Sequence, residues 1–122
     1  MKILIAEDEN ISRSLLKRTL EKWGYEVTAT ENGNEALEAF QNNNFSIVIT
    51  DWMMPGMDGI ELVKEIRQHE RPDYVYVILL TAKSDKEDLV LGMNAGADDF
   101  ISKPFDRDEL RVRLSAGKRV IG

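Results

Sequence analysis

Residues suited to phosphoryl transfer stand at four separate places along this chain. They are the acidic pair Glu7-Asp8, then Asp51, Thr81 and Lys103. Each place directly follows a short apolar run of the kind that forms a buried strand. The carboxyl ends of parallel strands lie at one edge of a sheet, where ligands bind. We therefore expect these five side chains to converge on a single pocket.

The chemistry of the five groups suits a phosphoryl group together with a divalent cation. Three carboxylates provide the oxygen ligands that a hard cation such as Mg²⁺ takes, and a hydroxyl and an ammonium group suit phosphoryl oxygens. A carboxylate at a strand end, such as Asp51, can also act as a nucleophile and form an aspartyl phosphate. The alternative is that Asp8 and Asp51 only cap helices, as Asp often does. The position of all five residues at strand ends favours the site.

Composition indicates one domain, residues 1–122. Hydrophobic residues make up 43% of the chain, which is enough for one core, and the absence of cysteine excludes disulfides and thiolate metal sites. The formal charge of −6 is the opposite of the net positive charge that attracts nucleic acid, so we expect no direct nucleic-acid binding. The apolar N-terminus is too short for a signal sequence, and no run approaches the ~20 apolar residues of a membrane span. These features predict a cytoplasmic protein.

The apolar pattern predicts five strands alternating with five helices. Strands are expected near residues 3–6, 25–30, 47–49, 75–80 and 100–101. Helices are expected where apolar residues recur at helical spacing, at the following positions: Ile11, Leu15, Leu16, Leu20 and Trp23; Ala36, Leu37 and Phe40; Leu62, Val63 and Ile66; Leu89, Val90 and Met93; Leu110, Val112 and Leu114. Ser84 and Glu87 form a capping-box pattern, and Asp106 can cap the last helix. This alternation is typical of an α/β domain with helices on both faces of a parallel sheet.

These segments together resemble the receiver domain of two-component response regulators. The resemblance runs from Lys2 to about Leu114. The segments that carry it are Glu7-Asp8, Asp51-Trp-Met-Met-Pro-Gly-Met-Asp-Gly, Thr81-Ala82, Gly96-Ala97-Asp98-Asp99 and Lys103-Pro104-Phe105. The resemblance implies a flavodoxin-like (βα)5 fold, with a five-stranded parallel sheet of order 2-1-3-4-5.

The same resemblance implies roles for the acidic residues. Asp51 would accept a phosphoryl group from a histidine kinase or a phosphotransfer protein. Asp8 and Asp51 would hold Mg²⁺ together with the backbone carbonyl of Met53, and Glu7 would contribute directly or through a metal-bound water. Such a protein is a signalling switch that catalyses only its own phosphorylation and dephosphorylation, and is not an enzyme for an external substrate.

The resemblance also implies how phosphorylation would be read. Thr81 would bond one phosphoryl oxygen and Lys103 another, and Lys103 would pair with Asp51 in the resting state. The Lys103-Pro104 peptide bond would be cis. Phe100 matches the aromatic switch residue of the family, often Tyr, so a switch here would depend on packing. The output surface would comprise the fourth helix, the fifth strand and the fifth helix.

Three other interpretations of the site remain as alternatives. An unphosphorylated interaction scaffold would be favoured by the loss of Asp51 or Lys103, and both are present. A haloacid-dehalogenase-type aspartyl-phosphate hydrolase carries a second Asp two residues after the nucleophile, where this chain has Met53. A flavin-binding flavodoxin would need a phosphate loop after the first strand, where Glu7-Asp8 stands.

Several residues outside the site have a simple structural interpretation. His69 is expected at the surface, Trp23 as a core anchor at a helix end, and Trp52 as a partly exposed loop residue near the metal. Met53, Met54 and Met57 offer either loop packing or a soft surface for a partner.

The C-terminal part of the chain is basic and leads into an expected linker. Residues from about 117 are predicted to begin a linker to an output domain of unknown kind. The basic residues Arg111, Arg113, Lys118 and Arg119 form a solvated helix face in the simplest interpretation. Alternatively, they pair with Asp98 or Asp99 of a second copy, in a homodimer formed on phosphorylation.

Overall fold

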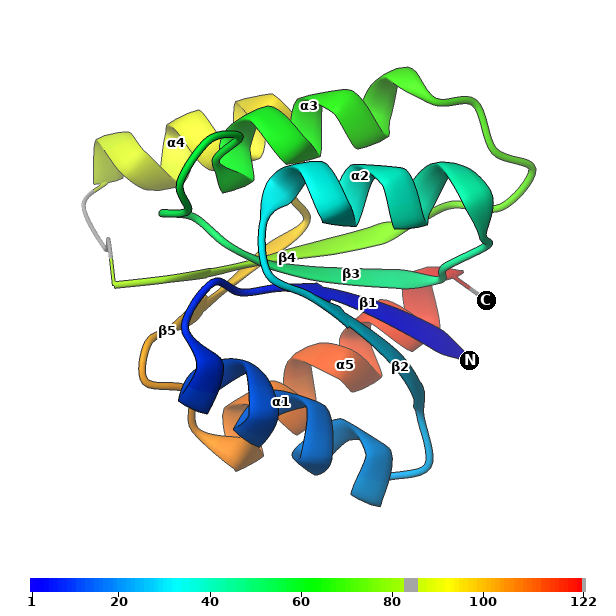
Figure 1. Ribbon diagram of the computed structural model, residues 1–122, viewed down its shortest axis with the longest axis vertical. Coiled ribbons are helices and arrows are strands. Elements are labelled where there is room, and N and C mark those ends of the chain that lie inside the picture. Colours follow the sequence, from blue (N-terminus) through cyan, green and yellow to red (C-terminus); the bar gives the residue numbers. More distant parts are fainter. Residues whose placement is uncertain (83–85, 122) are drawn as a thin grey trace.

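Five strands and five helices alternate along the chain in the computed structural model, which describes residues 1–82 and 86–121 (Figure 1). The strands are β1 Lys2–Ala6, β2 Glu26–Thr30, β3 Ile47–Asp51, β4 Tyr76–Thr81 and β5 Asp99–Ser102. The helices are α1 Asn10–Lys22, α2 Gly33–Asn42, α3 Gly59–Gln68, α4 Lys86–Ala95 and α5 Arg107–Ile121. In the part of the chain described, no helix is both long and apolar enough to cross a membrane.

The strands form one parallel sheet of order β2-β1-β3-β4-β5, which confirms the predicted topology. The order reverses between β1 and β3, and the carboxyl ends of the strands at such a reversal are where parallel α/β sheets typically bind ligands. Register aligns these ends, because Ala6 of β1 pairs with Thr50 of β3 and Asp51 pairs with Leu80 of β4. The sequence positions that follow the strands therefore share one edge.

Helices α2, α3 and α4 cover one face of the sheet, and α1 and α5 cover the other (Figure 1). Successive strand residues point to opposite faces, so Leu4 packs under the first group of helices while Ile3 and Ile5 pack under the second. The three central strands are buried on both sides, which explains their unbroken apolar runs in the sequence. The two apolar layers on either side of the sheet form the core.

The apolar residues at helical spacing lie on the predicted helices, but not all of them are buried. Leu16 and Leu20 of α1 are buried, but Ile11 is 77% exposed and Leu15 is 39% exposed. Consecutive residues of a helix lie about 100° apart, so a narrow contact stripe that buries Leu16 cannot also bury Leu15. The same holds for further residues that are exposed on their helices: Val90 and Met93 of α4, and Val112 of α5.

Side chains cap α2, α3 and α5. Asn32 accepts a hydrogen bond from the backbone of Glu35, and Asp58 forms a capping box with Glu61. Asp106 accepts hydrogen bonds from the backbone N–H groups of residues 108 and 109, which confirms it as the cap of α5. The predicted capping box at Ser84 lies outside the described residues.

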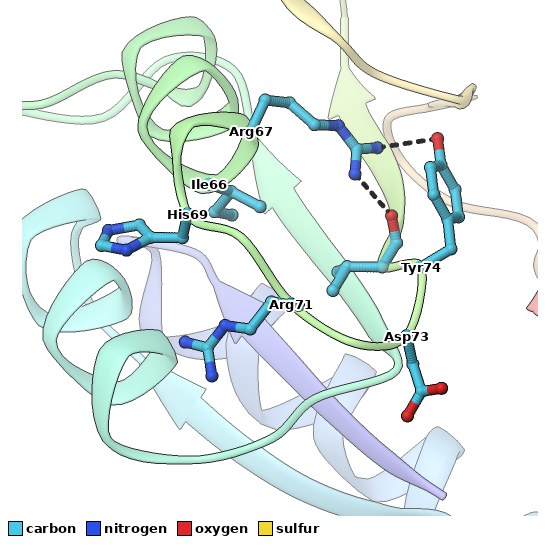
Figure 2. Close-up of a pocket in the computed structure, with 7 residues that line it drawn as sticks. Ile66, Arg67, His69, Arg71, Asp73 and Tyr74 are labelled. Atoms are coloured by element: carbon cyan, nitrogen blue, oxygen red, sulfur yellow. Dashed lines mark hydrogen bonds between the residues drawn. The ribbon is translucent and has the colours of Figure 1, made fainter.

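At the end of the sheet opposite the predicted site, Arg67 joins α3 to β4 and to the segment before β5. Its guanidinium donates to the carbonyls of Gly96 at 2.9 Å and Val75 at 2.7 Å, and to the Asp98 carboxylate at 2.8 Å. Figure 2 shows Arg67 reaching toward the hydroxyl of Tyr74. Asp98 also accepts from the backbone N–H of residue 77. This network explains the fixed position of the Gly96-to-Asp99 segment.

The same end of the molecule holds a surface hollow of about 330 Å³ lined by Arg67, His69 and Arg71 among others (Figure 2). Arg71 donates to the carbonyl of Phe40 and lies over its ring. His69 is partly exposed and contacts Phe40 and Gln41. The two arginines are thus engaged by the chain itself, and the hollow is the seam between α3 and β4.

We expect Arg67→Met to lower the free energy of unfolding by about 2–3 kcal/mol, because it leaves a carboxylate and two carbonyls without their charged donor. The matched control is Arg111→Met, since Arg111 lies over the Trp23 ring at 5.2 Å from its centroid on an exposed helix face. We expect Arg111→Met to lower the free energy of unfolding by about 1 kcal/mol or less. Urea denaturation measures both, and equal losses would contradict the structural role of Arg67.

Candidate functional site

The structure brings all five predicted site residues to the carboxyl edge of the sheet. Asp51 is the last residue of β3 and Thr81 the last residue of β4. Glu7 and Asp8 directly follow β1, and Lys103 directly follows β5. Neither Asp8 nor Asp51 caps a helix, because the N-cap residues of α1 and α3 are Glu9 and Asp58.

Lys103 joins the two buried acids of the site. Its ammonium lies 2.9 Å from Asp51 Oδ2 and 3.0 Å from Glu7 Oε1. Lys103 is 25% exposed at its side chain, whereas Glu7 is 1% exposed and Asp51 is 5% exposed. The expected pairing of Lys103 with Asp51 is confirmed, and the bond to Glu7 is an addition that no sequence pattern indicates. The Lys103-Pro104 peptide bond is cis, as the resemblance implied.

Three carboxylates stand close enough to share a cation. Glu7, Asp8 and Asp51 each offer an oxygen, and these oxygens lie within 4.8 Å of one another. Asp8 is exposed while the other two are buried. Carboxylate oxygens are the ligands that hard divalent cations prefer, so the donor set fits Mg²⁺. Met53 follows two residues after Asp51 with an exposed side chain.

The charges of the site perturb one another. The pKa of Glu7 is raised to about 7, chiefly by burial and next by the hydrogen bond with Asp51, and the Lys103 ammonium opposes this rise only in part. Burial alone would lower the pKa of Lys103, but the hydrogen bonds to Asp51 and Glu7 outweigh burial and raise it. The Lys103 ammonium thus compensates the two buried carboxylates only in part.

The loop after Asp51 folds back tightly over the start of α3. A Cβ on Gly59 would lie 2.3 Å from the carbonyl oxygen of Asp51, so only glycine permits this approach. Gly59 N–H also donates to the Trp52 carbonyl at 2.8 Å. Trp52 is consequently 5% exposed and belongs to the core cluster. The prediction of a partly exposed Trp52 was wrong because the loop turns its side chain inward.

The three methionines of this loop differ in exposure. Met53 is exposed, Met54 is buried, and Met57 is partly buried against Gly33. Loop packing therefore accounts for Met54 and Met57, and of the three only Met53 presents a soft side chain to a partner.

Thr81 and Phe100 link the site to α4 and β5. Thr81 is buried, and its carbonyl accepts a hydrogen bond from Lys103 N–H at 3.0 Å. The ring of Phe100 lies against α4 at Gly92, where an added Cβ would be 2.6 Å from the ring. The sequence prediction did not single out Gly92. A glycine inside a helical pattern is itself a signal of close packing.

Asp98 and Asp99, which were predicted to pair with basic residues of a second copy, each have a basic partner within the chain. Asp98 pairs with Arg67 at 2.8 Å, and Asp99 lies 3.6 Å from Arg113. Lys118 lies over the ring of Tyr25. A homodimer stays a prediction.

The sequence matches the response regulator receiver domain family over residues 3–115. It is 42% identical over 120 residues to the transcriptional regulatory protein CseB of Streptomyces avermitilis, an alignment that covers 98% of this chain and 50% of CseB. A Francisella response regulator receiver domain superposes with a TM-score of 0.88 at 36% identity, covering 98% of each chain. The chemotaxis protein CheY4 of Vibrio cholerae gives a TM-score of 0.90 at 32% identity, covering 94% of this chain and 96% of CheY4.

This chain belongs to the response regulator receiver domain family, whose members act in two-component systems. The flavodoxin-like architecture expected from the sequence is confirmed by the strand order and by these neighbours. The chain spans about half the length of the curated relatives that it matches.

The raised pKa of Glu7 predicts a pH dependence of stability. Its ordinary pKa of 4.5 becomes about 7 in the folded state, so the folded state holds the proton more tightly. The resulting stabilisation is complete below about pH 4.5 and is lost as pH rises to about 7. In this window Glu7 lowers the free energy of unfolding with a slope of at most about 1.4 kcal/mol per pH unit.

Glu7→Gln should remove this slope and make the variant more stable than the wild type at pH 8, in metal-free buffer. Glu38→Gln, which changes an exposed carboxylate of α2, should keep the wild-type slope. Denaturation curves at pH 4.5 to 8 test this. If Glu7→Gln retains the wild-type slope, the proton resides on another group.

Proposed function

We propose that this domain accepts a phosphoryl group on Asp51 from a histidine kinase or a phosphotransfer protein and passes the signal to an output surface. The observation that carries the proposal is the geometry around Lys103. Its ammonium joins Asp51 to Glu7, and Asp8 completes a three-carboxylate group beside them. A cytoplasmic location agrees with a kinase as the donor.

In the transfer step, an Asp51 carboxylate oxygen forms a bond to phosphorus as the phosphorus–nitrogen bond of phosphohistidine breaks. The imidazole leaves with the electron pair and takes up a proton from solvent. Lys103 would bond an oxygen of the transferred group, and the Thr81 hydroxyl would bond another. Positioning and charge compensation are the main catalytic contributions in phosphoryl transfer.

The residues that would hold Mg²⁺ are Asp8 and Asp51, with the Met53 carbonyl and with Glu7 directly or through water. When bound, Mg²⁺ supplies positive charge that offsets the repulsion between the carboxylates and the phosphoryl oxygens. Before phosphorylation, Lys103 supplies part of this compensation to Glu7 and Asp51. The raised pKa of Glu7 reflects how incomplete that compensation is.

The two alternative functions are less well supported. A haloacid-dehalogenase-type hydrolase would need an acid where Met53 stands, and Met53 is an exposed apolar side chain. Two buried carboxylates, Glu7 and Asp51, share the Lys103 ammonium. This arrangement raises the pKa of Glu7 and lowers the stability of the fold near neutral pH. A scaffold that is never phosphorylated would have no need of it.

The output surface is proposed to comprise α4, β5 and α5. Helix α4 buries only Gly92 and Ala95 among its residues, while Val90, Leu91 and Met93 are about half exposed. A helix with so little buried surface is readily displaced. When Thr81 moves toward a phosphoryl group, Phe100 would move inward and α4 would adjust.

The output itself is inferred from relatives. CseB is a transcriptional regulatory protein, and its alignment with this chain covers half of its length. We therefore propose that the domain regulates an output domain or a partner protein. Helix α5 runs to Ile121, with Gly117 buried against Tyr76. The segment from 117 to 121, expected to begin a linker, is therefore helical. Phosphorylation-dependent homodimerisation belongs to the same proposal.

A small phosphodonor with Mg²⁺ should add one base-labile phosphoryl group, and Asp51→Asn should abolish this. The change removes the nucleophilic oxygen while keeping the size of the side chain. Intact-mass spectrometry measures the stoichiometry. Asp73→Asn, which changes an exposed carboxylate beyond the opposite end of the sheet, is the control and should label fully. Equal labelling of the Asp51→Asn protein would mean that another carboxylate is the acceptor.

Thr81→Ala should still accept the phosphoryl group but show a weaker response of α4 and β5, because it removes the hydroxyl that draws the β4 end inward. Amide hydrogen exchange with and without a beryllofluoride phosphate mimic reports the response. Thr28→Ala, which removes an exposed hydroxyl of β2, should respond like the wild type. Changes confined to α1 or α3 would place the output surface near the 53–57 loop instead.

A further inference from the structure

Arg13 of α1 binds the main chain of the acidic pair from outside the metal site. Its Nη1 donates to the carbonyl of Glu7 at 3.0 Å and to that of Asp8 at 3.5 Å. Its Nη2 donates to the Asn10 side chain and, at 3.4 Å, to Glu31. The side chain is only 16% exposed.

The other described contacts of this loop act on its ends and on the Glu7 side chain, where Glu9 bonds to Ser12 and Glu7 bonds to Lys103. Glu7 N–H bonds to the Thr30 carbonyl at 3.1 Å, which fixes the first residue after β1. Asp8 is exposed, and the N-cap residue Glu9 makes no side-chain cap hydrogen bond to the start of α1. The position of the Asp8 carboxylate therefore depends on how its main chain is held, and Arg13 holds it.

The simpler interpretation is that Arg13 forms a surface ion pair with Glu31. That pair is long, and the Glu31 side chain is 63% exposed, so it contributes little. The contact with the Glu7 carbonyl is shorter and partly buried. A planar guanidinium presents several donors in a fixed fork, which lets one side chain span two successive carbonyls and Asn10.

We propose that Arg13 is a positioning residue that sets the Mg²⁺ affinity of the site by holding the Glu7-Asp8 main chain, an inference that rests on the proposed function. Groups that orient metal ligands typically change metal affinity by about 10- to 100-fold. Two effects of Arg13 oppose each other. Its charge repels a cation, whereas its hydrogen bonds preorganise the ligands. We expect the preorganisation by the hydrogen bonds to outweigh the repulsion.

Arg13→Met and Arg13→Lys separate these effects. The methionine variant removes both charge and donors, and the lysine variant keeps the charge but lacks the fork. We expect both to raise the Mg²⁺ concentration for half-maximal response by roughly tenfold. The readout is Trp52 fluorescence, measured in a Trp23→Phe background that leaves one tryptophan beside Asp51. Glu31→Gln should shift the midpoint by less than about twofold, and Asp8→Ala should abolish the response.

A second readout distinguishes positioning from general destabilisation. At saturating Mg²⁺ the phosphorylation rate of Arg13→Met with a small donor should return to the wild-type value, because only the midpoint depends on Arg13. A purely structural role would lower that rate at every Mg²⁺ concentration and would overturn the proposal. Tighter binding by the methionine variant with an unchanged lysine variant would show a charge effect and also overturn it, as would unchanged midpoints in both.

Failure of the proposed function gives a different result, because the wild type itself would then show no Mg²⁺ response. In that case metal-free amide exchange of residues 8–10 decides. Faster exchange in both Arg13 variants than in Glu31→Gln supports the role of Arg13 in holding the loop, and equal exchange overturns it.

Discussion

The structure is organised around one electrostatic constraint, which is that three carboxylates must be held together at a sheet edge beside the Lys103 ammonium. Carboxylates at this distance repel each other, and burial of Glu7 and Asp51 strengthens the repulsion. The strand register, the close approach at Gly59 and the Lys103 contacts fix them in place nevertheless. The raised pKa of Glu7 is the measurable consequence of this arrangement. A site under such repulsion favours any added positive charge, which is the physical basis of the proposed cation binding and of the proposed acceptance of a phosphoryl group with its counter-ion.

The two ends of the sheet are stabilised in different ways. At the amino end, Arg67 and Asp98 form a network of charged hydrogen bonds that joins α3, β4 and the segment before β5. At the carboxyl end, α4 is attached through little buried surface. A local change at the site can therefore move α4 while Arg67 keeps the opposite end in place. One small domain can therefore combine a well-anchored amino end of the sheet with a helix, α4, that is held by few buried residues.

The fold and the site residues could be predicted because both depend on local patterns. Buried parallel strands produce apolar runs, and candidate site residues at strand ends follow those runs directly, as Asp51 and Thr81 do. The predictions failed where tertiary geometry decides. Trp52 was expected to be partly exposed and is buried because its loop folds back at Gly59. The bond between Lys103 and Glu7, and the contacts of Arg13 with the acidic loop, join side chains and carbonyls that no sequence pattern connects.

The contact between Phe100 and Gly92 has a thermodynamic consequence for the proposed switch. The ring occupies the space that a Cβ on α4 would need, so the ring and the helix cannot move independently. Because phenylalanine has no hydroxyl, such a movement exchanges apolar contacts and leaves hydrogen bonds unchanged. Burial of apolar surface carries a large heat-capacity change and weakens on cooling. In the proposed switch, the balance between two positions of α4 should therefore depend on temperature as well as on phosphate.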